Sequence, residues 1–200
     1  MKKTLVLLLA FCLLLGLAAC GGTSGGTDGG SGGTKATEAE TTAAPAAQVY
    51  DVGEFTVEVP ANYFICEQTD PFGEKDEEGN YPVRTDMIAL VKDGEDAWDI
   101  FSKATVYITK FETSSVNPEF TKEFYEDAAD VECSINGIEC TAFTGNSTGT
   151  DDEVYTYAII FYPISDEFTM QITLPLSVNG DSVAIDDPDA QAIMSSIKLK

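Results

Sequence analysis

Val154-Tyr155-Thr156-Tyr157-Ala158-Ile159-Ile160-Phe161-Tyr162 is a nine-residue stretch in which apolar and aromatic side chains occupy nearly every position. Its β-branched and aromatic residues favour a strand. A strand without a polar face is typical of the interior of a sheet that is covered on both sides. We therefore expect residues 154–162 to form a central strand around which the domain is built.

The neighbouring stretches predict strands with one wet face. Phe168, Met170, Ile172 and Leu174 alternate with polar residues, which is the period of a half-buried strand. Similar patterns, bounded by Gly, Pro and Asp, predict further strands at residues 55–59, 62–67, 85–92 and 103–111. Residues 70–82 are polar and interrupted by Gly and Pro, so we expect a long surface loop there.

Asn136-Gly137 predicts a hairpin between residues 131–135 and 138–143. A two-residue type I′ turn needs positive φ at both positions, which Asn and Gly tolerate. This turn fixes a register in which paired residue numbers sum to 273, so that Cys133 lies opposite Cys140. Such a pair is close enough for a disulfide. The alternative is two small apolar residues that remain thiols.

Two helices are predicted by their start signals. Asn117-Pro118-Glu119 places a capping residue before a proline, which predicts a helix over residues 118–129. Asp187-Pro188-Asp189 repeats the signal, and Ala190, Ile193, Met194 and Ile197 form one apolar stripe. The expected fold class is α+β, with a mostly antiparallel β-sheet and two helices packed on it.

The N-terminus has the features of a secretory signal: Lys2 and Lys3, then an apolar run, then small residues. Leu17-Ala18-Ala19-Cys20 resembles the lipobox of bacterial lipoproteins. The resemblance implies that residues 1–19 are a signal peptide and that Cys20 is the lipidated first residue, carrying acyl chains such as palmitate. The protein would then be lipid-anchored at the extracytoplasmic face of the cell membrane. The alternative is an ordinary cleaved signal in which Cys20 is incidental.

Residues 20–48 predict a disordered linker, because they are rich in Gly, Ser, Thr and Ala and hold almost nothing large and apolar. A coil of this length spans about 30 Å. A glycosylated stalk is the alternative. Residues 49–200 are long enough for one folded domain.

The pattern of residues 55–60, the Asn136-Gly137 hairpin and the closing helix with its tail Ile197-Lys198-Leu199-Lys200 resemble the PsbP/Mog1-like α-β-α sandwich domain. The resemblance implies a sheet enclosed by helices. Photosynthetic members of that family are associated with a manganese and calcium cluster. None of their functional residues is matched here, so metal handling is not implied.

Composition excludes several kinds of function. The chain has 34 Asp and Glu against 11 Lys and Arg, a formal charge of −23, which disfavours nucleic acid as a partner. It has no histidine, the commonest general base and metal ligand. We expect no cofactor and no metal site, because Cys66, Cys133 and Cys140 lack zinc spacing. Calcium binding by the acidic loops remains open, although they lack the spacing of a calcium loop.

The domain is rich in aromatic residues, and Tyr81 and Trp98 fall in segments predicted to be loops. Exposed aromatic residues suit the binding of a peptide, a glycan or a partner protein. We expect a non-catalytic binding or accessory module at the cell envelope. The alternatives are a carboxylate-dependent hydrolase of cell-wall or carbohydrate material, and a subunit of an envelope or transporter complex.

Overall fold

The computed structural model describes residues 47–149 and 152–200, which form two sheets and a few short helices. The predicted signal peptide, Cys20 and nearly all of the predicted linker lie outside these residues. The larger sheet is antiparallel throughout. Its strands lie side by side in the order β3 (Tyr63–Thr69), β4 (Val83–Lys92), β5 (Thr105–Glu112), β10 (Phe168–Ser177), β9 (Val154–Tyr162), β8 (Ile138–Thr148) and β6 (Glu126–Asp130), and β7 (Cys133–Ile135) pairs with β8 beside β6.

Strand β9 is an interior strand with both faces covered, as its sequence predicts. It pairs with β10 on one side and with β8 on the other. Ala158 and Ile160 belong to the main core, whereas Ile159 and Phe161 belong to a second cluster on the opposite face. The two faces of the sheet are called inner and outer below.

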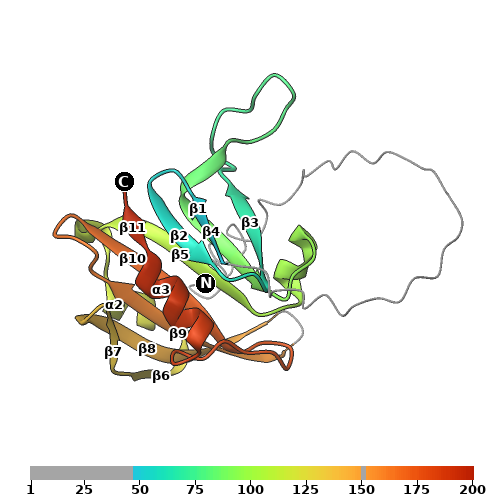
Figure 1. Ribbon diagram of the computed structural model, residues 1–200. Coiled ribbons are helices and arrows are strands. Elements are labelled where there is room, and N and C mark those ends of the chain that lie inside the picture. Colours follow the sequence, from blue (N-terminus) through green and yellow to red (C-terminus); the bar gives the residue numbers. More distant parts are fainter. Residues whose placement is uncertain (1–46, 150–151) are drawn as a thin grey trace, which may run out of the picture.

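The inner face carries the main core. A smaller sheet of β1 (Gln48–Asp51), β2 (Phe55–Val59) and β11 (Lys198–Leu199) lies over it together with α3 (Pro188–Ser196) (Figure 1). The alternating strand β2 buries Phe55, Val57 and Val59 against the larger sheet. Helix α3 buries the stripe that its sequence predicts, Ala190, Ile193 and Met194, and Ile197 is buried at its C-cap.

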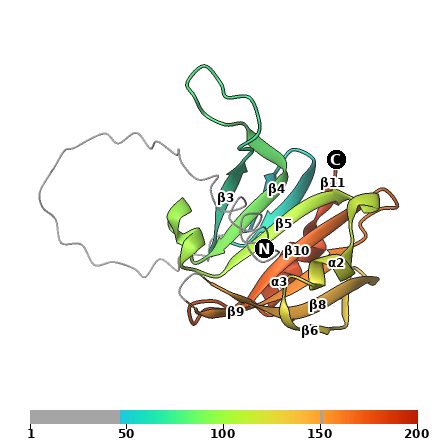
Figure 2. The same ribbon diagram turned by 180° about the vertical axis from the view of Figure 1, so that it is seen from behind.

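The described residues cover the outer face at its two sides. The 3-10 helix η1 (Ala97–Phe101) packs over β3 and β4 through Ala97 and Ile100. On the other side, Val116, Tyr125 and Ala128 pack against Phe143, Ile159 and Phe161 of β8 and β9. These three residues come from the segment that holds η2 (Thr113–Ser115), α2 (Pro118–Lys122) and the edge strand β6. Figure 2 shows this face, with β5 and β10 between the short green η1 and α2.

The expected fold class is therefore wrong in its balance of elements. Within the described residues the fold is dominated by antiparallel sheet, and the two α-helices there have only five and nine residues. Of these two helices, α3 buries side chains in the core, whereas α2 has no buried residue. A second small sheet, rather than a second helix, completes the inner layer, so the arrangement is not the α-β-α sandwich that the PsbP-like resemblance implies.

The predicted helix over residues 118–129 is too long. Asn117 caps α2 as expected, since its side chain accepts a hydrogen bond from the backbone N–H of Phe120. The helix ends at Lys122, and residues 126–130 form β6 instead. The start signal was correct, but pairing of this segment with β8 overrides its helix propensity.

The hairpin register is confirmed. Cys133 pairs with Cys140, Ser134 with Glu139, and Ile135 with Ile138. Asn136 and Gly137 have φ of 53° and 78°, the positive values that a type I′ turn requires. The same register continues into β6, where Asp130 pairs with Phe143 and Ala129 with Thr144.

Tyr63 buries a hydroxyl that has no hydrogen-bond partner within the described residues. Burial is the main cause that raises the pKa of this tyrosine, and the nearby carboxylates of Asp187 and Asp189 add to the rise. We expect Tyr63→Phe to raise the free energy of unfolding by about 1 kcal/mol, because the unsatisfied hydroxyl is removed. Urea denaturation measures this change.

Thr169→Val is the matched control. The Thr169 hydroxyl is equally buried but lies 3.0 Å from the hydroxyl of Thr113. Its loss should lower the free energy of unfolding by about 1 kcal/mol. A loss of stability in Tyr63→Phe as large as that in the control would contradict the interpretation of Tyr63.

Candidate functional site

The centre of the outer face carries uncharged polar and aromatic side chains. Every second residue of β5, β10 and β9 points to this face, and across strands Thr109 lies opposite Gln171 while Tyr107 lies opposite Thr173. We call this surface the outer strip. Its half-buried residues are Tyr107, Gln171, Thr173, Tyr155 and Tyr157, and the buried residues Thr105, Thr109, Pro175 and Ile159 lie among them.

Two half-buried tyrosines of the strip, Tyr107 and Tyr157, lie on its opposite sides. Tyr107 packs against the cluster of Cys66, Ala89 and Val91 under η1. Tyr157 packs against the cluster of Phe143, Ile159 and Phe161. With the half-buried Gln171 and Thr173 between them, the strip offers aromatic rings together with hydroxyl and amide groups.

The hydroxyls of Tyr107 and Tyr157 are neutral at physiological pH, because the pKa of each is raised. Burial is the main cause that raises the pKa of Tyr107, and proximity to Tyr157 adds to it. Burial also raises the pKa of Tyr157, and it raises the pKa of Tyr125 to about 12. These groups can donate and accept hydrogen bonds but cannot act as bases near neutral pH.

One side of the strip is held in place by Tyr125 and Gly145. The ring of Tyr125 lies 5.5 Å from that of Phe143 and 6.4 Å from that of Tyr157. A Cβ atom on Gly145 would lie 2.6 Å from the Cβ of Tyr125, so only glycine allows this close approach. Gly145 therefore lets Tyr125 lie directly on the sheet.

Exposed aromatic pairs stand on both sides of the strip. On η1, Trp98 is 66% exposed and its ring centroid lies 6.1 Å from that of Phe101. At α2, Phe120 and Phe124 make an edge contact at 5.0 Å and are also about half exposed. These rings extend the aromatic surface beyond the sheet itself.

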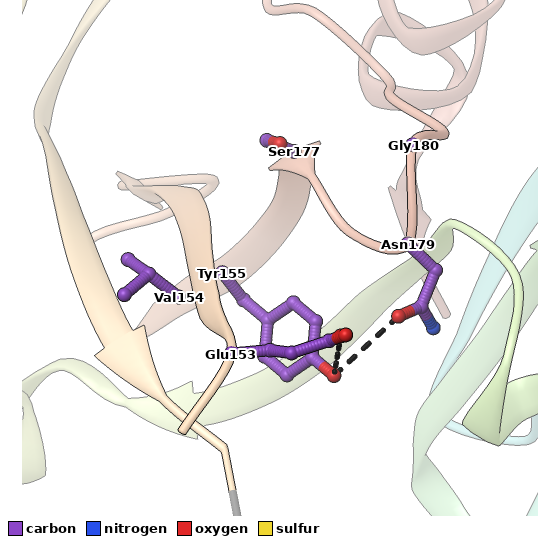
Figure 3. Close-up of a pocket in the computed structure, with 6 residues that line it drawn as sticks. All are labelled: Glu153, Val154, Tyr155, Ser177, Asn179 and Gly180. Atoms are coloured by element: carbon purple, nitrogen blue, oxygen red, sulfur yellow. Dashed lines mark hydrogen bonds between the residues drawn. The ribbon is translucent and has the colours of Figure 1, made fainter. Parts of the chain in front are cut away.

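At one end the strip opens into a shallow polar depression of about 510 Å³ (Figure 3). The hydroxyl of Tyr155 points to its centre and lies 3.1 Å from Oε2 of Glu153 and 3.4 Å from Oδ1 of Asn179. Asn179 also donates to the carbonyl of Ser102, which caps η1. The depression is therefore joined through Asn179 to the side of the strip that carries Trp98.

The strip differs from the rest of the surface in charge. The chain has 34 acidic residues. Among the described residues that form the outer strip, none is acidic and none is Lys or Arg. Glu153 lies at the end of the strip. A neutral surface on so acidic a chain suits a ligand without charge.

The two aromatic residues proposed from sequence lie far apart. Tyr81 immediately precedes the β4 strand and Trp98 follows it, so the ten residues of β4 place them about 30 Å apart. Tyr81 is 38% exposed, and its ring lies 4.3 Å from the ammonium of Lys75 in its own loop. Trp98 belongs to η1, whose residue Ile100 packs in the same cluster as Tyr107 of the strip, whereas Tyr81 precedes the other end of β4.

The acidic loops serve their own folding. Asp76 accepts hydrogen bonds from the backbone N–H groups of Glu78 and Asn80, and Asp187 caps α3. The backbone hydrogen bond from Asn80 is the main cause that lowers the pKa of Asp76. Within residues 47–149 and 152–200, no group of three or more Cys, Asp or Glu is arranged to hold a metal ion.

Sequence reasoning missed the outer strip as a site. A signal was present, because Thr169, Gln171 and Thr173 are polar yet uncharged in a chain rich in acids. Tyr107, Thr173 and Tyr157 come from separate parts of the chain, and only the strand order β5-β10-β9 brings them together.

Comparison with known proteins identifies no relative. No protein-family model matches this chain, and no curated protein matches it either. Among the helices of the described part, none is long and apolar enough to cross a membrane.

Proposed function

We propose that this protein is a lipid-anchored binding module of the cell envelope whose outer strip binds a neutral glycan. The observation that carries the proposal is the uncharged surface of tyrosine, threonine and glutamine on a chain with a formal charge of −23. Anchoring through Cys20 is supported by the signal-like residues 1–19, and residues 20–48 would act as the tether.

A glycan fits the chemistry of the strip. Sugar rings combine apolar C–H faces, which stack on aromatic rings, with hydroxyl groups that exchange hydrogen bonds with Tyr, Thr and Gln. Tyr107 and Tyr157 would supply the rings, and Gln171 and Thr173 lie between them. A carboxylated or sulfated glycan would be repelled by the acidic surface around the strip.

A peptide ligand is less well suited to this surface. Extended peptides are commonly bound by adding a strand to a free sheet edge. Strands β5, β10 and β9 are each paired on both sides, so they offer no free edge to a peptide. The strip can therefore be used only through its side chains.

Binding without turnover is the activity we propose. Hydrolysis of a glycosidic bond commonly needs two carboxyl groups about 5–10 Å apart across the bond. The strip itself contributes none, and the carboxylate of Glu153 at its end stands beside the Tyr155 hydroxyl. The residues of the strip can bind and orient a ligand but are not equipped to cleave it.

The proposal predicts that Tyr157→Ala weakens glycan binding at least tenfold. Loss of about 1.4 kcal/mol of stacking and hydrogen bonding corresponds to that factor. Retention of the purified chain on insoluble neutral polysaccharides and titration with their soluble oligosaccharides would measure the dissociation constant. Tyr107→Ala should have a similar effect.

Tyr81→Ala is the matched control, because it removes a partly exposed tyrosine at the far end of β4. It should leave binding unchanged.

A carboxylated polysaccharide with the same backbone should bind at least tenfold more weakly. Equal binding by wild type and Tyr157→Ala would contradict the proposed site, and release of sugar products would favour a hydrolase instead.

A further inference from the structure

Cys133 and Cys140 lie directly opposite each other on the β7–β8 hairpin. Both are half-buried free thiols that pack against the main core. In a hairpin with a two-residue turn, the pair beside the turn, Ile135 and Ile138, exchanges backbone hydrogen bonds. The alternation of pairs makes Cys133 and Cys140 the next hydrogen-bonded pair, with Cα atoms about 5.5 Å apart.

We propose that Cys133 and Cys140 form a structural disulfide that closes the hairpin. The expected Cα separation lies inside the range that a disulfide spans without moving the backbone. Each cysteine loses one proton and one electron as the S–S bond forms. The oxidant is a second disulfide, either a small molecule or an envelope oxidoreductase, which is reduced to two thiols through a mixed disulfide with one of the cysteines.

Cys66 has a separate place in the structure. It is buried with Ala89 and Val91 on the outer face, whereas Cys133 and Cys140 pack against the inner core. The sheet stands between them, so Cys66 cannot exchange with this pair while the domain is folded. The hairpin pair is therefore the one disulfide that the described residues can form.

The surroundings of the pair indicate a structural bond rather than a catalytic one. Burial raises the pKa of Cys133, and it raises the pKa of Cys140 to about 12. Few thiolates form at neutral pH, so the reduced pair reacts slowly with disulfides. Catalytic cysteine pairs have lowered pKa values instead.

The cross-link would act on the helix that covers the core. At the turn of the hairpin, the side-chain amide of Asn136 donates to the backbone carbonyl of Ser195 in the last turn of α3. Ile135, beside the turn, is buried in the main core. Fixing the two strands of the hairpin therefore holds the turn against the C-terminal end of α3.

This inference depends on the proposed function only for the oxidising surroundings that export would provide. The pairing can be tested on the purified full-length chain, treated with oxidised glutathione or with a reductant, denatured and then alkylated. Glutamyl endopeptidase cuts after Glu132 and after Glu139, which separates the two cysteines. We expect peptide 133–139 linked to peptide 140–153 in the oxidised sample, with the Cys66 peptide alkylated.

The melting temperature gives a second measurement. Closing an eight-residue loop should raise the melting temperature of the oxidised chain above that of the reduced chain by roughly 5–10 °C. The shift should vanish in Cys133→Ala and persist in Cys66→Ala. Two alkylated peptides after oxidation, or equal melting temperatures for both forms of the wild type, would overturn the proposal whether or not the protein binds glycans.

Discussion

Replacement of Cys20 by alanine is expected to remove the chain from the membrane or to stop its processing. The sulfur of Cys20 is the proposed attachment point of the lipid, so its removal should take away the proposed anchor. None of the described helices is able to span a bilayer in its place. The result should be either a processed protein in the soluble fraction or an unprocessed precursor of larger size.

Cys12→Ala is the matched control for this experiment. Cys12 lies within the same apolar run, but cleavage before Cys20 would remove it. This variant should be processed and anchored like the wild type. Cell fractionation with mass measurement of the product separates the outcomes, and a processed Cys20→Ala protein that stays in salt-washed membranes would show that the anchor is elsewhere.

Local signals in the sequence predicted much of the sheet. Asn136-Gly137 defined a turn with positive φ, and the turn alone fixed the pairing of Cys133 with Cys140. The continuous apolar pattern of residues 154–162 predicted an interior strand with the same bounds that β9 has. At the turn, the residues of the segment itself determine the backbone conformation, and in β9 burial on both faces requires an apolar strand. Local pattern and final structure therefore agree in both places.

Elements that depend on distant partners were not predictable. Residues 126–130, Glu-Asp-Ala-Ala-Asp, have almost no strand propensity and form β6 only because β8 has an edge to pair with. The two-residue β11 forms only where β2 offers it an edge. The helix predicted over residues 118–129 was too long for the same reason, because a capping signal fixes where a helix begins but not its length.

The candidate site was also beyond local reasoning. Trp98 was proposed from sequence because it is aromatic and falls in a segment predicted to be a loop, and in the structure it belongs to η1, whose residue Ile100 packs in the same cluster as Tyr107. The strip itself depends on β10 lying between β5 and β9, which no local signal specifies.

Ile159→Ala and Ile160→Ala should each lower the free energy of unfolding by about 2–5 kcal/mol. The two residues are neighbours in β9, so their side chains point to opposite faces of the sheet, and both are fully buried. Ile160 packs in the main core, whereas Ile159 packs with Phe143 and Phe161 under the segment of α2 and β6. A strand covered on one face only would show a large loss at just one of the two positions.

Urea denaturation of the purified variants would measure these losses. Val154→Ala is the control in the same strand: Val154 is 58% exposed, and the change should stay within about 0.5 kcal/mol. In β10, Ile172→Ala should cost as much as Ile160→Ala, whereas Thr173→Ala on the outer strip should cost little. A loss below about 1 kcal/mol for Ile159→Ala would mean that the segment containing α2 and β6 does not cover Ile159 in solution. The aromatic contacts of Tyr157 on that side of the strip would then be absent as well.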